Sequence, residues 1–247
     1  AWIDRDSYWV LAGLSLASAL LFLTLPAQLQ KASTGRGLAQ VLGGIQFVRR
    51  NPIVLGCISL DLFSVLLGSV MALLPIYAID ILQVGPEALG VLRGMPALGA
   101  VMVGLVMARL PLHRPGTNLF GALVLFSLSI LLFAYSTSLW LSLAALWLYG
   151  ATDMVSVNIR STLIQMATPD DLRGRVSAVN SIFVATSNEM GDFRAGAVAA
   201  ILPATTTVAL GGLMALGVAI GGYILFPGIR KLGSLSEIVP EKVSTAG

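Results

Sequence analysis

The chain has 247 residues and a formal net charge of +3; 56% of its residues are hydrophobic and 11% are charged. About a quarter of the residues in a soluble domain are charged, and the mean hydropathy of +0.88 is far above that of such a domain. The composition therefore excludes a soluble enzyme and indicates an integral membrane protein. The small positive charge does not indicate a nucleic-acid partner, because basic residues beside membrane helices usually set their orientation.

The membrane spans are expected to be α-helices. Backbone amides in hydrocarbon need partners within the protein, so only helices and closed barrels cross a bilayer. The apolar runs here are about 20 residues long, whereas barrel strands alternate in polarity over about ten. We predict an all-α fold, a polytopic membrane helix bundle. Seven transmembrane helices are expected, at 8–26, 52–77, 89–110, 118–136, 139–164, 177–203 and 206–226.

Basic residues occur in alternate connections between these spans. They follow the first, third, fifth and seventh spans: Lys31, Arg36, Arg49, Arg50, His113, Arg114, Arg173, Arg175, Arg230 and Lys231. By the positive-inside rule these regions are cytoplasmic, which places residue 1 outside and the tail 227–247 in the cytoplasm. The chain begins with alanine and lacks the layout of a signal peptide, so we interpret it as the continuation of a longer protein.

Local patterns predict helix starts and helix packing. An apolar stripe in the first cytoplasmic connection predicts an amphipathic linker helix; it consists of Leu38, Val41, Leu42, Ile45 and Val48. Pro86 and Pro169 each stand at the first position of an expected helix, and Thr168 precedes the second of them as a cap. Two GxxxG pairs, at 90–94 and 217–221, predict close packing between helices.

Ionisable residues inside the spans follow a period of three. The first, fourth and seventh spans have none in their interiors; the others contain Asp61, Arg93, Asp153, Arg160, Glu189, Asp192 and Arg194. A charge near the bilayer centre costs from about 3 to above 10 kcal/mol, so such side chains normally face a cavity or a partner. Without the first span, the helices form two triplets in the order charged, charged, apolar. This order indicates an inverted repeat like those of secondary transporters.

The acidic residues of the second and fifth spans are candidates for a substrate or proton pathway. Asp61 lies about nine residues into its span, near mid-depth, and either faces a cavity or is hydrogen-bonded inside the bundle. Asp153 and Arg160 are two helical turns apart and form a polar seam. Arg160 either belongs to that seam or snorkels toward the cytoplasmic side as an anchor.

The sixth span has the most polar face. Four residues share that face at about 100° per residue: Ser177, Ser181, Asn188 and Asp192. Glu189 flanks the stripe. A substrate or proton pathway would explain these residues, and so would hydrogen bonding between helices. Arg194 points away from Asp192, so we expect it to meet an acid on another helix or to reach the outer interface.

Known catalytic motifs are missing from the sequence. It contains no HExxH, GxSxG or P-loop pattern. Cys57 is the only cysteine and His113 the only histidine, so an internal disulfide is impossible and neither a Cys/His metal site nor a cofactor is expected. An enzyme is disfavoured. Two alternatives to transport stay open: an intramembrane hydrolase with Asp153 and Asp192 as a carboxylate pair, and a non-transporting membrane scaffold.

Two stretches, read with the inverted triplets, resemble a known family. They are TPDDLRGR at 168–175, followed by a polar span, and SLDLFSVLLGSVMALLPIYAIDILQVGPEALGVLRG at 59–94. Together they are similar to the carboxyl-terminal half of a major facilitator superfamily transporter, most of all to the exporter branch that includes the enterobactin exporter and macrolide efflux relatives. The resemblance implies helix 6 at 1–26, the central cytoplasmic loop at 27–51, three-helix repeats at 52–136 and 137–226, and a cytoplasmic tail at 227–247.

The resemblance also implies a function. Such proteins export small molecules, such as siderophores or drugs, across the inner or plasma membrane by proton-driven alternating access between two six-helix halves. The expected partners are therefore membrane lipid, the amino-terminal half, a small-molecule substrate and protons. Asp61 and Asp153 would line the central cavity, and the helices in the middle of each triplet would contact the other half. Arg173 and Arg175 match the RGR element of the inner gate.

Overall fold

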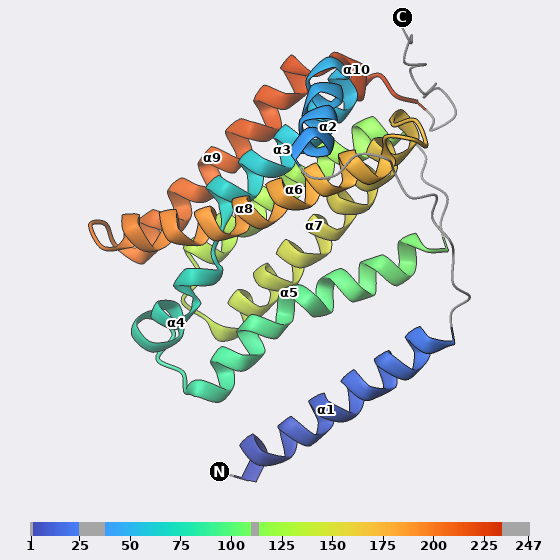
Figure 1. The fold of residues 1–247 in the computed structure, drawn as a ribbon. Helices are drawn as coiled ribbons and strands as arrows, with labels where there is room; N and C mark the ends of the chain where they lie inside the picture. Colours follow the sequence, from blue (N-terminus) through green and yellow to red (C-terminus); the bar gives the residue numbers. More distant parts are fainter. Residues whose placement is uncertain (1, 25–37, 110–113, 234–247) are drawn as a thin grey trace, which may run out of the picture. The chain divides into compact units, whose positions relative to one another are not determined.

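The computed structural model describes residues 2–24, 38–109 and 114–233, and this part of the chain forms helices and turns without a β-strand (Figure 1). The chain divides into two compact units, Ala1–Arg36 and Gly37–Gly247. The first contains α1 (Trp2–Leu23), whose 22 residues suffice to cross a bilayer. Just after α1, the Thr24 hydroxyl donates to the Leu21 carbonyl at 2.7 Å.

The second unit is a helix bundle. It starts with α2 (Leu38–Arg50), the predicted linker helix, and α3 (Pro52–Gly68). A short stretch of mixed helix follows, made of η1 (Met71–Leu73), α4 (Leu74–Ile76) and η2 (Tyr77–Ile81). The remaining helices are α5 (Pro86–Met107), α6 (Pro115–Ala134), α7 (Leu139–Ala167), α8 (Arg173–Ala199), α9 (Ala204–Leu225) and α10 (Pro227–Arg230).

Five segments of the described chain are long and apolar enough to cross a membrane: Pro52–Ile81, Pro86–Met107, Pro115–Ala134, Leu139–Ala167 and Ala204–Leu225. Each overlaps a predicted span. Helix α1, with 22 residues, is not among these five, and neither is α8, which has the length of a span with 27 residues. Helix α8 contains two arginines in its first turn and three more charged residues near its other end, which lower its hydropathy.

One of the two predicted helix starts is confirmed, and α3 begins at a cap that was not predicted. Asn51 caps α3, where its side-chain oxygen accepts from the amides of Ile53 and Val54 at 3.1 Å. Pro86 is the first residue of α5, as predicted. The cap assigned to Thr168 is wrong, because α8 begins only at Arg173. The Thr168 hydroxyl instead donates to the Ile164 carbonyl at 2.6 Å, at the end of α7.

The second predicted span is broken. Its helix stops at Gly68, and Ser69 is extended, with φ −62° and ψ 133°. A 3-10 turn, a short α-helical stretch that contains Pro75, and a π-helical turn over Tyr77–Ile81 complete the span. Figure 1 shows the α4 region turning away from the axis of α3. The continuous helix expected over 52–77 is therefore interrupted at Ser69 and Val70, with α3 before the interruption and the three short elements η1, α4 and η2 after it.

Two glycines bring α5 and α7 into close contact. A Cβ on Gly99 would collide with the Trp147 carbonyl, and a Cβ on Gly150 would collide with the Pro96 carbonyl. The GxxxG pairs do not have this role, because a Cβ on any of the glycines at 90, 94, 217 and 221 would meet no described atom within 4 Å. The prediction of packing at these two pairs is therefore wrong for the part of the chain described.

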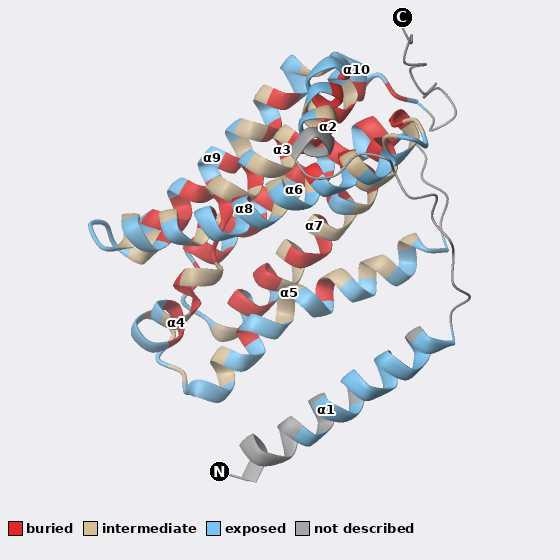
Figure 2. Cartoon of the chain, viewed as in Figure 1, coloured by how far each residue is buried: buried red, intermediate tan, exposed pale blue. Residues whose placement is uncertain are grey.

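Two apolar clusters fill the bundle, and Figure 2 shows their buried residues on the helix faces that meet one another. The first includes Val54 and Cys57 of α3 with Leu163 of α7. The second surrounds Tyr77, whose ring stacks on Phe133 with 4.4 Å between centroids.

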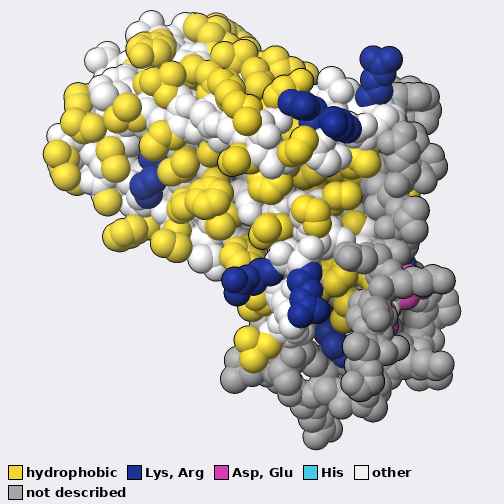
Figure 3. Space-filling view, turned by 90° about the horizontal axis from the view of Figure 1, so that it is seen from above, with side chains coloured by type: hydrophobic (Ala, Val, Ile, Leu, Met, Phe, Trp, Pro, Cys, Tyr) yellow, Lys and Arg dark blue, Asp and Glu magenta, His cyan; other side chains and the backbone are white. Residues whose placement is uncertain are grey.

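The outer surface of the bundle is also apolar. In Figure 3, hydrophobic side chains cover much of the described face, and Lys and Arg appear at a few places only. Large apolar side chains that are exposed include Leu98, Val101, Leu105, Leu128, Leu213 and Ile224. A surface of this kind is suited to lipid.

Candidate functional site

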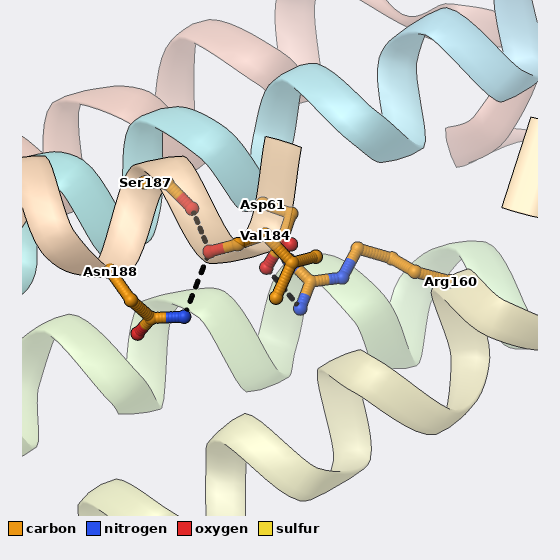
Figure 4. Close-up of polar contacts among 5 residues, drawn as sticks. All are labelled: Asp61, Arg160, Val184, Ser187 and Asn188. Atoms are coloured by element: carbon orange, nitrogen blue, oxygen red, sulfur yellow. Dashed lines mark hydrogen bonds and ion pairs between the residues drawn. The ribbon is translucent and has the colours of Figure 1, made fainter. Parts of the chain in front are cut away.

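A buried ion pair joins α3 to α7 in the interior of the bundle. The Arg160 guanidinium contacts the Asp61 carboxylate at 2.7 Å, and the two side chains are only 5% and 14% exposed, respectively. Figure 4 shows the contact between the two helices. Since an unpaired charge in this environment is strongly unfavourable, each residue makes the burial of the other possible.

Buried neighbours in the sequence direct Asp61 and Arg160 toward the bundle interior. Cys57, one turn before Asp61 on α3, is completely buried and aligns this face of the helix with the bundle interior. On α7, Ile159 and Leu163 are fully buried on either side of Arg160. The sequence left two roles open for Arg160, and the structure places its side chain in the interior seam.

Asp61, Asp153 and Arg160 line a common cavity of about 120 Å³. Three helices form its wall: α3, α7 and α8. The other residues that line it are Cys57, Val65, Val157, Ser161, Ile164, Asn180, Val184 and Asn188. A water molecule occupies about 30 Å³ of liquid, so the space could hold a few waters but not a drug-sized ligand, which needs at least about 300 Å³.

Asp153 differs from Asp61 in having no direct contact with Arg160, although the charge of Arg160 acts on it at longer range. Its carboxylate makes no hydrogen bond or ion pair with the described residues, whereas Asp61 is held by Arg160. With Arg160 protonated and both carboxylates ionised, the three residues have one net negative charge. The cavity thus contains a carboxylate that is available to bind a proton or a polar ligand.

Asn188 adds an amide to the same wall. Its side-chain nitrogen donates to the Val184 carbonyl at 2.9 Å, and the Ser187 hydroxyl donates to the same carbonyl at 2.9 Å (Figure 4). The amide oxygen of Asn188 has no described partner. Asn180 stands two turns earlier on α8 and lines the cavity as well. Asn180, Val184 and Asn188 are four residues apart and therefore lie on one face of α8. This spacing predicts that Asn180 shares the cavity wall, but the sequence analysis did not use it.

The polar stripe predicted on α8 divides among separate places. Of its residues, only Asn188 lines the cavity. Ser177 lines a second cavity of about 90 Å³ beside Thr168 and Arg173. Ser181 is exposed on the surface, as is Glu189, the residue that flanks the stripe.

The two basic residues at the start of α8 have different surroundings. The exposed Arg173 pairs with Asp170 at 2.7 Å and donates through Nε to the Gln165 carbonyl at 3.2 Å. Its contacts thus link the start of α8 to the end of α7. Arg175 lies against α2, where a Cβ on Gly44 would be 2.9 Å from the Arg175 carbonyl oxygen. The linker helix therefore packs on α8 next to this arginine.

Asp192 and Arg194 lie at the break in the second span. Arg194 donates through Nε to the Leu66 carbonyl at 2.9 Å and through Nη2 to the Leu67 carbonyl at 2.7 Å. The expectation of an acid partner on another helix is therefore wrong, because both donors bind backbone carbonyls. The Asp192 carboxylate accepts a hydrogen bond from the Ser69 hydroxyl. Asp192 does not line the cavity that contains Asp153, which counts against a hydrolase built on these two carboxylates.

This arrangement defines a class: a multi-pass membrane protein whose helix bundle encloses paired and unpaired charges beside a small polar cavity. The family model of the Major Facilitator Superfamily matches residues 5–188. The chain belongs to that superfamily. The match extends from α1 through the cavity-lining part of α8.

The curated relatives are exporters. The enterobactin exporter EntS of Escherichia coli O157:H7 is 26% identical over 211 residues, which is 85% of this chain and 50% of that protein. The enterobactin exporters EntS of Escherichia coli O1:K1 / APEC and of Escherichia coli strain SMS-3-5 are each 27% identical, over 83% and 84% of this chain. The chain spans about half the length of the curated relatives that it matches.

Proposed function

We propose that this chain forms one half of a secondary active transporter that exports a small molecule, with proton coupling and alternating access. The observation that carries the proposal is the cavity in which the unpaired Asp153 lies beside the Asp61–Arg160 ion pair. Membership of the Major Facilitator Superfamily and similarity to curated exporters support it.

A carboxylate that makes no direct ion pair favours transport over a passive scaffold. Charged groups inside membrane proteins are expensive and normally serve ion or proton pathways when they are not paired. Asp61 is neutralised by Arg160, so it stabilises the bundle in this conformation. Asp153 can gain and lose a proton without first breaking an ion pair. It is therefore the coupling residue in our proposal, and Asn188 is a residue that contacts substrate.

The architecture that we propose is the half-transporter expected from the family. In it, α1 corresponds to helix 6, and the bundle from α3 to α9 forms two inverted three-helix repeats at 52–136 and 137–226. The region 27–51 is the central loop, and the tail 227–247 is cytoplasmic. Residues 1–26 end the first half, and the protein resides in the inner or plasma membrane.

The amino-terminal half completes the substrate cavity in this proposal. The described cavity is too small for a siderophore or a drug, so the other half must supply the remaining wall. The exposed polar residues of α8, Ser181 and Glu189, would face that half or the space between the halves. Arg173 and Arg175 would belong to the inner gate.

The test is transport by the full-length protein in lipid vesicles with a pH gradient. Candidate siderophores and drugs are offered to the wild type and to the double variant Asp61→Asn, Asp153→Asn. We expect the double variant to lose at least about tenfold in rate, equivalent to about 1.4 kcal/mol of activation free energy. Asp80→Asn is the matched control, because Asp80 is an exposed acid of the π-helical turn outside the cavity.

Two outcomes would contradict the proposal. One is transport by the double variant at the wild-type rate. The other is an equal loss in Asp80→Asn, because the effect would then not depend on the cavity. Correct insertion of each variant is checked by its yield and by its elution as a single species in detergent.

A further inference from the structure

The break in the second span leaves backbone groups that need partners. The last four carbonyls of an α-helix have no partner within the helix, and in α3 two of them belong to Leu66 and Leu67. At membrane depth, water cannot serve every such group, and non-helical backbone persists only where protein or a cavity surrounds it. Something in the bundle must therefore satisfy the end of α3.

Arg194 satisfies two of these carbonyls. Its Nε and Nη2 donate to the carbonyls of Leu66 and Leu67 at 2.9 and 2.7 Å. The carboxyl end of a helix has a partial negative charge, so a guanidinium is the favoured partner there. The planar fork of donors also lets one side chain serve two adjacent carbonyls.

Asp192 binds the segment at which α3 is interrupted. Its carboxylate accepts a hydrogen bond from the hydroxyl of Ser69, the first residue after α3. On α8, Arg194 thus binds the last turn of α3, and Asp192 binds the first residue after it. We name the set of Ser69, Asp192 and Arg194 the α3 clamp.

Two glycines make the clamp possible. A Cβ on Gly191 would lie 2.9 Å from the Val65 carbonyl oxygen and 3.1 Å from the Ser69 Cβ. A Cβ on Gly211 of α9 would lie 2.8 Å from the Leu67 carbonyl oxygen and 3.5 Å from Arg194 Nη2. Without side chains at these positions, α8 and α9 approach the end of α3 closely enough for Arg194 to reach both carbonyls.

The segment beyond the break is attached separately. Tyr77 stacks on Phe133, and its hydroxyl donates to the Ala134 carbonyl at 3.0 Å. The segment Met71–Ile81 is thus bound to α6 at one end and to α8, through Ser69, at the other. Between these attachments its backbone changes from a 3-10 turn to α-helical and then π-helical geometry. A joint of this kind can bend when one attachment is released.

We propose that Asp192 and Arg194 are positioning residues that set the angle between α3 and the segment Met71–Ile81, so that this segment moves only when the α3 clamp opens. The same α8 carries Asn188, one turn before Asp192, in the wall of the Asp61–Asp153 cavity. A change in the cavity that shifts α8 is therefore transmitted to the clamp. This link to transport rests on the function proposed above; the clamp itself rests on the contacts.

The test measures distances in the full-length protein in lipid nanodiscs. Spin labels are placed at Ile79, exposed in η2, and Leu128, exposed on α6, after native cysteines are replaced by serine. A reference pair at Leu128 and Trp140 reports the packing of α6 against α7. Distance distributions are compared for the wild type, Arg194→Gln, Arg194→Lys and Arg93→Gln. Arg93 is the matched control, an exposed arginine in another span that makes no described contact with α3.

We expect Arg194→Gln to shift or broaden the Ile79–Leu128 distribution by at least about 2 Å, the scale of helix shifts in switching proteins. The reference pair should not change, Arg194→Lys should restore most of the wild-type distribution, and Arg93→Gln should match the wild type. An unchanged distribution in Arg194→Gln would overturn the proposal. Equal changes in both label pairs would also overturn it, because Arg194 would then serve general folding.

The distance test is separate from the transport test. If Arg194→Gln shifts Ile79 but wild-type vesicles transport no candidate solute, the clamp stands and the proposed function fails. If the vesicles transport in the predicted way but Ile79 does not respond to Arg194→Gln, the clamp fails and the function stands.

Discussion

Arg160 of α7 and Asp61 of α3 form an ion pair of 2.7 Å inside the helix bundle, with both side chains largely removed from solvent. They are far apart in the sequence and belong to different three-helix groups of the proposed repeat. The pair therefore connects the two groups at the wall of the cavity, and Asp153 is the cavity carboxylate that makes no direct ion pair with a described residue.

The first prediction concerns the stability of this pair. Asp61→Asn should destabilise the protein by about 3–5 kcal/mol, because breaking a buried pair leaves an uncompensated charge. The double variant Asp61→Asn, Arg160→Gln should be more stable than either single variant. Thermal unfolding in detergent by intrinsic fluorescence measures these differences. Additive effects of the two single changes would show that Asp61 and Arg160 are not coupled.

The second prediction concerns the contact between α5 and α7. Gly150→Ala places a methyl group against the Pro96 carbonyl and should destabilise the protein by about 1–3 kcal/mol, the usual effect of overpacking. Gly121→Ala on α6 is the control, because a Cβ there meets no described atom within 4 Å. Unfolding temperatures of the two variants are compared. Equal unfolding temperatures would show that a methyl group at position 150 does not destabilise the contact between α5 and α7.

The third prediction concerns the attachment of the broken span to α6. Tyr77→Phe removes the hydrogen bond to the Ala134 carbonyl and should lower the free energy of unfolding by about 0.5–1.5 kcal/mol. Tyr135→Phe removes an exposed hydroxyl with no described hydrogen bond and should have little effect. Denaturation in a urea series in detergent measures both. A larger loss in Tyr135→Phe than in Tyr77→Phe would contradict the structural assignment.

The sequence predicted the helical class and the positions of most helices well. Long apolar runs leave no alternative to helices in lipid, so α3, α5, α6, α7 and α9 appear where they were expected. For Asp61 the sequence left two positions open, a cavity or a bond inside the bundle, and for Asp153 the cavity was implied only by the family resemblance; in the structure both line the cavity, and Asp61 is also paired with Arg160. These inferences need only the residue types along one chain and the general cost of burying a charge in a membrane.

The partners of the charges could not be predicted in the same way. The bond between Asp61 and Arg160 depends on how α3 packs against α7, which the periodicity of either helix does not define. The role of Arg194 depends on carbonyls that are available only because α3 stops at Gly68. Glycine followed by serine permits such a break but does not require it, and a neighbouring arginine that satisfies the exposed carbonyls stabilises it.

In the proposed mechanism, Asp153 couples transport to protons. The most direct test compares solute exchange and gradient-driven accumulation in vesicles. Without a pH gradient, solute exchange across the membrane needs no net proton movement. With a gradient, accumulation requires proton uptake and release at the coupling residue. Asp153→Asn should retain exchange within about twofold of the wild type and lose gradient-driven accumulation by at least about tenfold. Accumulation by Asp153→Asn at the wild-type level would contradict the account.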